Sequence, residues 1–117
     1  MKIRVAAVQP RSHHGSEEER NVVQALGWMD EAARQGADLV VFPEGYPGPT
    51  NPANSYDASG PLAERARSLG LHVVAGRIEP VEGEQGHHVC LYLIDDAGRR
   101  VGLYRRTSPV GPYVYKD

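Results

Sequence analysis

The fold of this chain is decided by residues 36–44, which read Gly36-Ala37-Asp38-Leu39-Val40-Val41-Phe42-Pro43-Glu44. Four apolar residues follow one another at 39–42 without the alternation of a half-buried strand. We therefore predict a strand over 38–42 in a parallel sheet that is covered on both faces. Gly36 is suited to end a preceding helix, and Glu44 follows the strand directly.

The residues before this stretch predict a strand and a helix. Residues 3–8 are a short apolar run closed by Gln9-Pro10, which is typical of a buried strand. Ser16 and Glu19 have the spacing of a capping box, and apolar residues then recur at helical spacing as far as Gly36. Strand, helix and strand in this order predict a right-handed crossover between two parallel strands.

The residues after this stretch predict a second helix and three more strands. Residues 43–59 are rich in Pro, Gly, Asn and Ser, which is typical of a long irregular loop. A helix with Pro61 at its first position and Gly70 at its end leads to a strand at 71–78. A turn at 79–86 then precedes a hairpin of strands 88–95 and 99–104. The order β-α-β-α-β-β-β places the chain in the α/β class.

The composition narrows the class of protein. A length of 117 residues suits one small domain, and a net charge of -2 argues against nucleic-acid or anionic membrane partners. The N-terminal apolar run is too short for a signal peptide, and no run has membrane-spanning length. Cys90 is the only cysteine of the sequence, which excludes an intramolecular disulfide. We expect a cytoplasmic protein.

Histidine pairs at 13–14 and 87–88 do not predict a metal site. Adjacent residues of an extended segment point to opposite faces, so neither pair is arranged to chelate one ion. No cysteine or carboxylate completes a metal-ligand spacing with them. We expect no metal.

Glu44 is the first candidate for chemistry. Open α/β sheets place their sites at the carboxyl ends of their strands, and Glu44 lies just beyond such an end. Partial desolvation beside Phe42 and Pro43 would raise its pKa toward the range of a general base. A solvent-facing turn residue is the alternative. Tyr46 and the turn at 47–49 follow directly, either as the wall of a substrate pocket or as a rigid surface loop.

Several segments together resemble the nitrilase, or carbon–nitrogen hydrolase, superfamily. They are residues 6–9 (AAVQ), 36–44, 73–76 (VVAG), 93–98 and 102–105 (GLYR), in the order and spacing of that family's N-terminal part. The resemblance implies part of a four-layer α-β-β-α sandwich. Residues 1–117 would then be an incomplete domain without its C-terminal half.

The resemblance also implies an activity. The family hydrolyses nonpeptide C–N bonds of small amides or nitriles with a Glu-Lys-Cys set and no cofactor. Glu44 matches the general base. Arg106 stands at the lysine position, where it would stabilise an oxyanion or form a surface ion pair. The nucleophilic cysteine belongs to the absent half, and Cys90, inside a strand with Tyr92 and Ile94 on its face, is expected to be an inert packing residue.

Two functions follow. The first is a carbon–nitrogen hydrolase that is inactive in this shortened form. The second is a non-catalytic truncated paralogue that serves as a binding or assembly module. A half-domain would expose an apolar face and self-associate. Homo-oligomeric assembly is an open alternative, because the family commonly pairs subunits through its sandwich.

Overall fold

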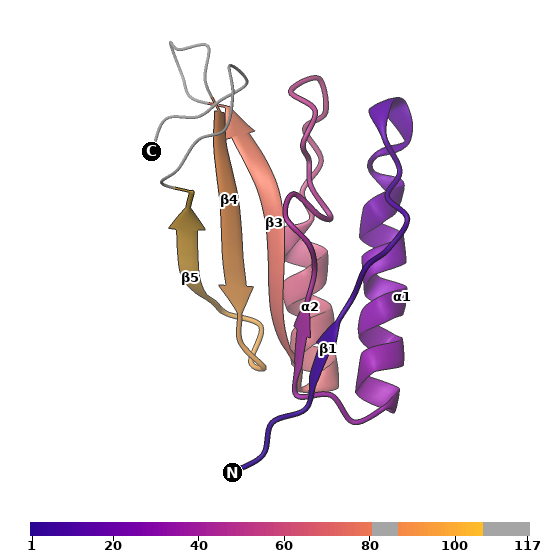
Figure 1. Ribbon diagram of the computed structural model, residues 1–117, viewed down its shortest axis with the longest axis vertical. Coiled ribbons are helices and arrows are strands. Elements are labelled where there is room, and N and C mark those ends of the chain that lie inside the picture. The colour runs from indigo at the N-terminus through magenta and orange to yellow at the C-terminus, as the bar shows by residue number, and fades with distance from the viewer. Residues whose placement is uncertain (81–86, 107–117) are drawn as a thin grey trace.

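The computed structural model describes residues 1–80 and 87–106 (Figure 1). Five strands form one sheet: β1 (Val5–Ala7), β2 (Leu39–Val41), β3 (His72–Pro80), β4 (His87–Ile94) and β5 (Arg100–Arg105). Two α-helices join the first three strands: α1 (Arg20–Arg34) and α2 (Ser59–Leu69). The α/β class and the predicted order of elements are confirmed.

The strands lie in the sheet in the order in which they occur in the sequence. β1, β2 and β3 are parallel, whereas β3, β4 and β5 are antiparallel. Each parallel connection contains a helix, as such crossovers require. The turn between β4 and β5 is held by Asp95, whose carboxylate accepts the N–H groups of Ala97 and Arg99 at 3.0 and 2.9 Å.

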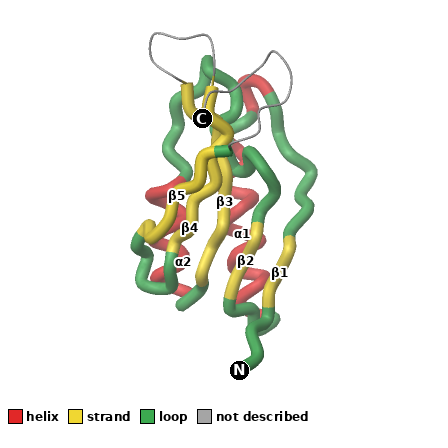
Figure 2. The backbone as a smooth tube through the Cα atoms, turned by 60° about the vertical axis from the view of Figure 1, so that its left-hand side comes forward, coloured by secondary structure: helices red, strands yellow, loops and turns green. Residues whose placement is uncertain are grey.

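Both helices pack on the same face of the sheet (Figure 2), and the core lies between them and the strands. Met29 and Leu62 from the helices meet Val40, Val73 and Tyr92 from the strands, and each of these side chains is at most 1% exposed. We call the face of the sheet on which α1 and α2 pack the helix face.

The opposite face, which we call the open face, has no cover within the described residues. Val5, Leu91 and Tyr104 on this side are 52%, 38% and 55% exposed. Within the described residues, the helices cover one face of the sheet, and the predicted cover of the second face stays a prediction. Successive crossovers of one hand that advance in one direction place their helices on the same side, and the first three strands advance in this way.

Both helices begin at other residues than the sequence predicts. The capping box of Ser16 and Glu19 is not formed: a 3-10 turn spans Gly15–Glu17, and Glu19 precedes α1 without a side-chain cap. α2 begins at Ser59 because the Asp57 carboxylate accepts the N–H groups of Ser59 and Gly60 at 3.0 and 3.1 Å. Pro61 thus lies inside the first turn.

Candidate active site

Glu44 sits on a tight turn just beyond β2. The N–H of Tyr46 donates back to the carbonyl oxygen of Pro43 at 3.1 Å, which closes the turn. Gly45 has a φ of 75°, the left-handed value that the third residue of a type II turn adopts. Only glycine adopts this conformation without strain. The turn lifts Glu44 out of the sheet at the carboxyl end of the strand.

Beyond this turn the chain returns to β3. The N–H of Gly76 donates to the carbonyl of Tyr46 at 2.7 Å, and the N–H of Gly48 donates to the carbonyl of Gly76 at 3.0 Å. A Cβ on Gly76 would lie 2.7 Å from the nitrogen of Gly45, so the close approach of the two segments excludes a side chain there. Residues 46–48 are buried. The segment is therefore an extension of the sheet and not a surface loop.

Arg106 follows β5, the edge strand of the sheet, and its side chain extends toward Glu44 beyond β2. Its Nη1 lies 3.4 and 3.5 Å from the two carboxylate oxygens of Glu44, across 62 residues of sequence. Its N–H also donates to the carbonyl of Val89 at 2.9 Å, which anchors the backbone at the end of β5. The neighbouring Arg105 turns to the helix face and contacts Glu79 at 3.2 Å. The structure thus brings together the two residues matched to the family's glutamate and lysine.

The Glu44–Arg106 pair is open to solvent. The Glu44 side chain is 65% exposed and that of Arg106 is 31% exposed. The expected desolvation of Glu44 is not found, because the turn projects the carboxylate away from Phe42, which is 2% exposed and part of the core. Of the described side chains, Arg106 is the one that hydrogen-bonds this carboxylate.

Tyr46 lies in the core and not beside Glu44. It is 2% exposed, and its hydroxyl donates to the side-chain oxygen of Gln24 on α1 at 2.6 Å. Its ring packs against Phe42 with a centroid distance of 5.2 Å. Burial raises the pKa of the hydroxyl well above its usual range. This placement ties the turn to α1, and a role in substrate binding stays a prediction.

Glu18 is a buried carboxylate near this turn, and the sequence does not reveal its burial. Its side chain is 2% exposed, and its carboxylate accepts the N–H of Thr50 at 2.9 Å and that of Asn51 at 3.3 Å. The Thr50 hydroxyl and the Asn54 side-chain amide donate to it as well. Burial raises the pKa of Glu18, but these hydrogen bonds outweigh that effect and hold it below its usual value. Among three consecutive glutamates, no sequence signal marks the one that is buried.

Cys90 is placed as a packing residue. It is 2% exposed and pairs in register with Arg77 of β3. Like the buried Tyr92 and Ile94, it lies on the helix face. Burial and the nearby Glu79 carboxylate raise the pKa of its thiol to about 11. A buried thiol that stays protonated is a poor nucleophile. Cys90 therefore cannot supply the attacking group at Glu44 on the other face.

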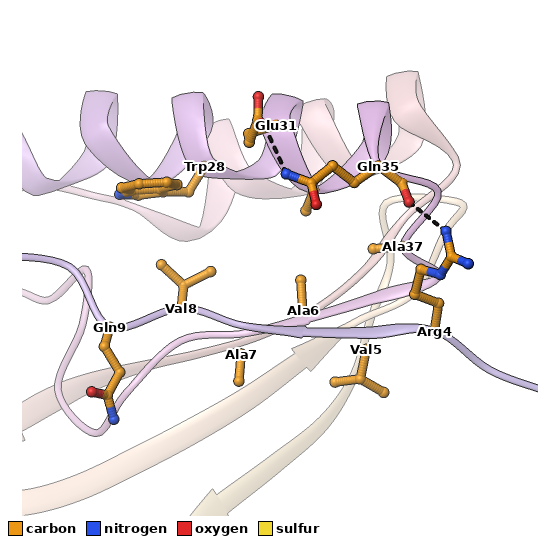
Figure 3. Close-up of a pocket in the computed structure, with 11 residues that line it drawn as sticks. Arg4, Val5, Ala6, Ala7, Val8, Gln9, Trp28, Glu31, Gln35 and Ala37 are labelled. Carbon is orange, nitrogen blue, oxygen red and sulfur yellow. Dashed lines mark hydrogen bonds between the residues drawn. The ribbon is translucent and has the colours of Figure 1, made fainter.

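A groove of about 310 Å³ lies between β1 and α1, apart from Glu44 and Arg106 (Figure 3). Ala6, Val8 and the Trp28 ring give it an apolar lining. Its charged side chains are engaged with Gln35: the guanidinium of Arg4 donates to the Gln35 carbonyl at 2.7 Å, and the Gln35 amide donates to Glu31. The groove is therefore mainly apolar, and its charged side chains are engaged with neighbours.

Two other kinds of feature are absent from residues 1–80 and 87–106. No three His, Cys, Asp or Glu side chains gather as they would around a metal ion. Neither helix of this part of the chain is long and apolar enough to cross a membrane.

Comparison with protein families gives one match over most of the chain. Residues 4–116 match the family model described as carbon–nitrogen hydrolase. A comparison with curated protein sequences gives no match.

Comparison with solved structures gives amidases of the nitrilase superfamily. A cysteine-to-alanine mutant of the amidase from Nesterenkonia AN1 superposes with a TM-score of 0.76 at 24% identity, over 95% of this chain and 45% of that chain. The same amidase mutated at a glutamate and a cysteine, in complex with acrylamide, gives 0.76 at 23% identity, and a complex with butyramide gives 0.75 at 24%, with the same coverage. The chain therefore has the fold of these amidases and spans less than half their length.

Proposed function

Because the chain belongs to the carbon–nitrogen hydrolase family, we propose that it supplies the glutamate-bearing half of an enzyme that hydrolyses a C–N bond in a small substrate. One observation carries the proposal: Glu44 and Arg106, 62 residues apart, meet at the end of the sheet where the family's glutamate and lysine would act. A structural ion pair would not require a turn that projects the carboxylate into solvent.

In the proposed reaction Glu44 is the general base. It takes the proton of a cysteine thiol supplied by the other half of the domain, and the sulfur attacks the carbon of the substrate. The Arg106 guanidinium donates hydrogen bonds to the oxyanion that forms. When the tetrahedral intermediate collapses, it expels the amine, which takes the proton back from Glu44. The acyl group is left on the cysteine as a thioester, and water then hydrolyses it. Arg106 is a planar fork and not an ammonium, so it approaches the oxyanion from another angle than lysine would.

The proposed substrate is a small amide or nitrile. The Nesterenkonia amidase of the same fold was obtained in complex with acrylamide and with butyramide, and both are short aliphatic amides. These complexes favour an amide over a nitrile. Arg106 suits either, because a carbonyl oxygen and a nitrile nitrogen both develop negative charge when the carbon is attacked.

The proposed domain is incomplete. The chain spans 45% of the related amidases, and its open face carries apolar side chains without cover in the described residues. A second sheet packed on that face would complete an α-β-β-α sandwich and bring the nucleophile to Glu44. The single buried thiol fits a reducing cytoplasm. The alternative, a non-catalytic assembly module, is favoured by the same open face and by the inert placement of Cys90.

A turnover assay of the 117-residue chain tests the proposal. We expect no hydrolysis of acrylamide, butyramide or a short nitrile, in the chain itself and in its Glu44→Gln variant, because neither contains the nucleophile. Robust activity that Glu44→Gln abolishes would contradict the need for a second half. Sequencing of the coding DNA downstream of codon 117 is the companion test. A strand followed by a cysteine at a helix start supports the hydrolase, and a stop codon without such a remnant supports the assembly module.

A further inference from the structure

Glu18 is an unusual residue among the charged groups of this chain. It is 2% exposed, and all its donors come from one segment, residues 50–54, which lies 32 to 36 residues further along the chain. A buried carboxylate is costly unless hydrogen bonds compensate its charge, and donors from Thr50, Asn51 and Asn54 do so here. The carboxylate is therefore a fixed attachment point for this segment.

The flanking glutamates show that this role is specific to Glu18. The Glu17 side chain is 58% exposed and pairs with Arg20 at 2.9 Å. Glu19 is exposed and makes no cap of the helix that follows it. Three identical residues in sequence thus have three different environments, and only Glu18 faces the loop that follows Glu44.

Thr50 links Glu18 to the turn that carries Glu44. A Cβ built on Gly45 would lie 3.0 Å from the Cγ2 methyl of Thr50, so the methyl group closes the space directly beside the turn. The Thr50 hydroxyl and N–H are held by Glu18. On its other side, Gly45 lies against Gly76 of β3. The turn is therefore enclosed between β3 and a threonine whose position Glu18 fixes.

We propose that Glu18 is a positioning residue of the active site: through Thr50 it holds the turn at 43–46 so that Glu44 stays opposite Arg106. The proposal rests on the proposed function of Glu44, because only a catalytic carboxylate needs this placement. Tyr46 provides a second attachment to α1 through Gln24, so loss of Glu18 should loosen the turn and not unfold the domain.

Amide hydrogen exchange, measured by NMR on the 117-residue chain, tests the proposal. In Glu18→Gln the amide cannot accept all of the donors, and we expect exchange at Thr50 and Tyr46 to rise by about tenfold or more. Amides in the pairing of β3 with β4 should rise by a clearly smaller factor than those at Thr50 and Tyr46, because they report only the general loss of stability. Glu19→Gln is the matched control, because it removes the same charge one residue away, and it should leave exchange at Tyr46 unchanged.

Thr50→Ser separates the two steps of the link and remains informative if Glu18→Gln does not fold. Serine keeps the hydroxyl for Glu18 but removes the methyl beside Gly45. We expect exchange at the Thr50 position to stay within about twofold of the wild type, while exchange at Tyr46 rises by about threefold or more. Unchanged exchange at Tyr46 in both variants would overturn the proposal. An equal rise in β3 and β4 would overturn it as well, because it would mean a general loss of stability.

A spectroscopic readout addresses Glu44 itself. Arg106→Gln should change the chemical shift of the Glu44 carboxyl carbon, and in a Glu18→Gln background this change should fall by half or more. An equal change in both backgrounds would show that Glu18 does not act on Glu44. None of these measurements uses turnover. A protein without hydrolase activity in any assembled form would refute the proposed function while leaving the positioning result intact.

Discussion

Arg105 and Arg106 are neighbours in the sequence, yet they contact carboxylates on opposite faces of the sheet. On the helix face, Arg105 joins Arg77 around Glu79, whose side chain is 24% exposed. On the open face, Arg106 pairs with Glu44, whose side chain is 65% exposed. The first cluster packs over the core, with Arg77 5.5 Å from the Tyr92 ring centre. Within residues 1–80 and 87–106, the side chains of the second pair hydrogen-bond each other and no other side chain, and both are partly exposed to solvent.

The same division applies to the other reactive side chains. The thiol of Cys90 and the carboxylate of Glu18 lie on the helix side, each 2% exposed and bound to neighbours. The helix side therefore uses its charged and polar groups to stabilise the fold. On the open side the Glu44–Arg106 pair is exposed, and under the proposed function stability and chemistry would depend on different residues.

The largest expected effect contrasts two side chains of β4. Ile94 is 1% exposed on the helix face, and Leu91 is 38% exposed on the open face. Ile94→Ala should lower the free energy of unfolding by about 2–5 kcal/mol, because it removes buried methyl groups and leaves a cavity. Leu91→Ala should lower it by less than about 1 kcal/mol. Urea denaturation of both variants measures the difference.

An equal cost for the two substitutions would break the contrast between the faces. It would mean that Leu91 is buried in solution, which requires association of chains through the open face. Sedimentation of the wild-type chain at several concentrations would then show oligomers.

The second effect concerns the accessibility of the helix face to reagents. Because burial raises the pKa of the Cys90 thiol from 9.0 to about 11, modification at pH 8 should be slower by about 100-fold than in the urea-unfolded chain. Reaction with a disulfide reagent, followed by absorbance, gives both rates. A folded-state rate within about threefold of the unfolded rate would show that the helix face opens readily.

The third effect is a dependence on pH. The pKa of Glu18 is lower in the folded chain than its ordinary value of 4.5, so its ionised form stabilises the fold above that pH. This contribution is lost as the pH falls through the folded-state value. At pH 7 Glu18→Gln should therefore cost about 1–3 kcal/mol, and the difference from wild type should shrink below pH 4.5. Denaturation curves at several pH values test this, with Glu19→Gln as the control. A difference independent of pH would mean that packing, and not charge, explains the cost.

The sequence predicts those features that depend on neighbouring residues, and it misses those that depend on contacts between distant segments. The strand at 38–42, the ends of the helices at Gly36 and Gly70, and the hairpin depend on local periodicity and turn residues, and the structure confirms them. The predicted cap of α1 is wrong: Ser16 lies in a 3-10 turn, and Glu19 precedes the helix without a side-chain hydrogen bond. Between them, Glu18 binds the distant loop, and a local capping rule does not include such long-range contacts.

The candidate site shows the same limit. The position of Glu44 beyond a strand and the matching of Arg106 come from the sequence. The contact between them cannot be predicted from strand neighbours, because β3 and β4 lie between β2 and β5 in the sheet. The predicted desolvation of Glu44 assumed that adjacent apolar residues would cover it. Phe42 instead turns into the core, because alternate residues of a strand face opposite sides.

The smallest expected effect is the one that best separates function from stability. Glu44→Gln and Arg106→Gln should each change the free energy of unfolding by less than about 0.5 kcal/mol, because an exposed ion pair at 3.4 Å contributes little in water. Glu79→Gln is the matched comparison on the helix face. It should cost about 1–2 kcal/mol, because it weakens the attachment of Arg77 and Arg105.

Urea denaturation under identical conditions gives all three values. If Glu44→Gln costs as much as Glu79→Gln, the open-face pair is a structural ion pair and the argument for a general base loses its main support. If Glu44→Gln is neutral or stabilising, the fold retains an exposed carboxylate that it does not need. Residues kept for chemistry commonly contribute nothing to stability or reduce it. A near-zero value for Glu44 beside a clear cost for Glu79 is therefore the pattern expected of a catalytic and a structural carboxylate on two faces of one sheet.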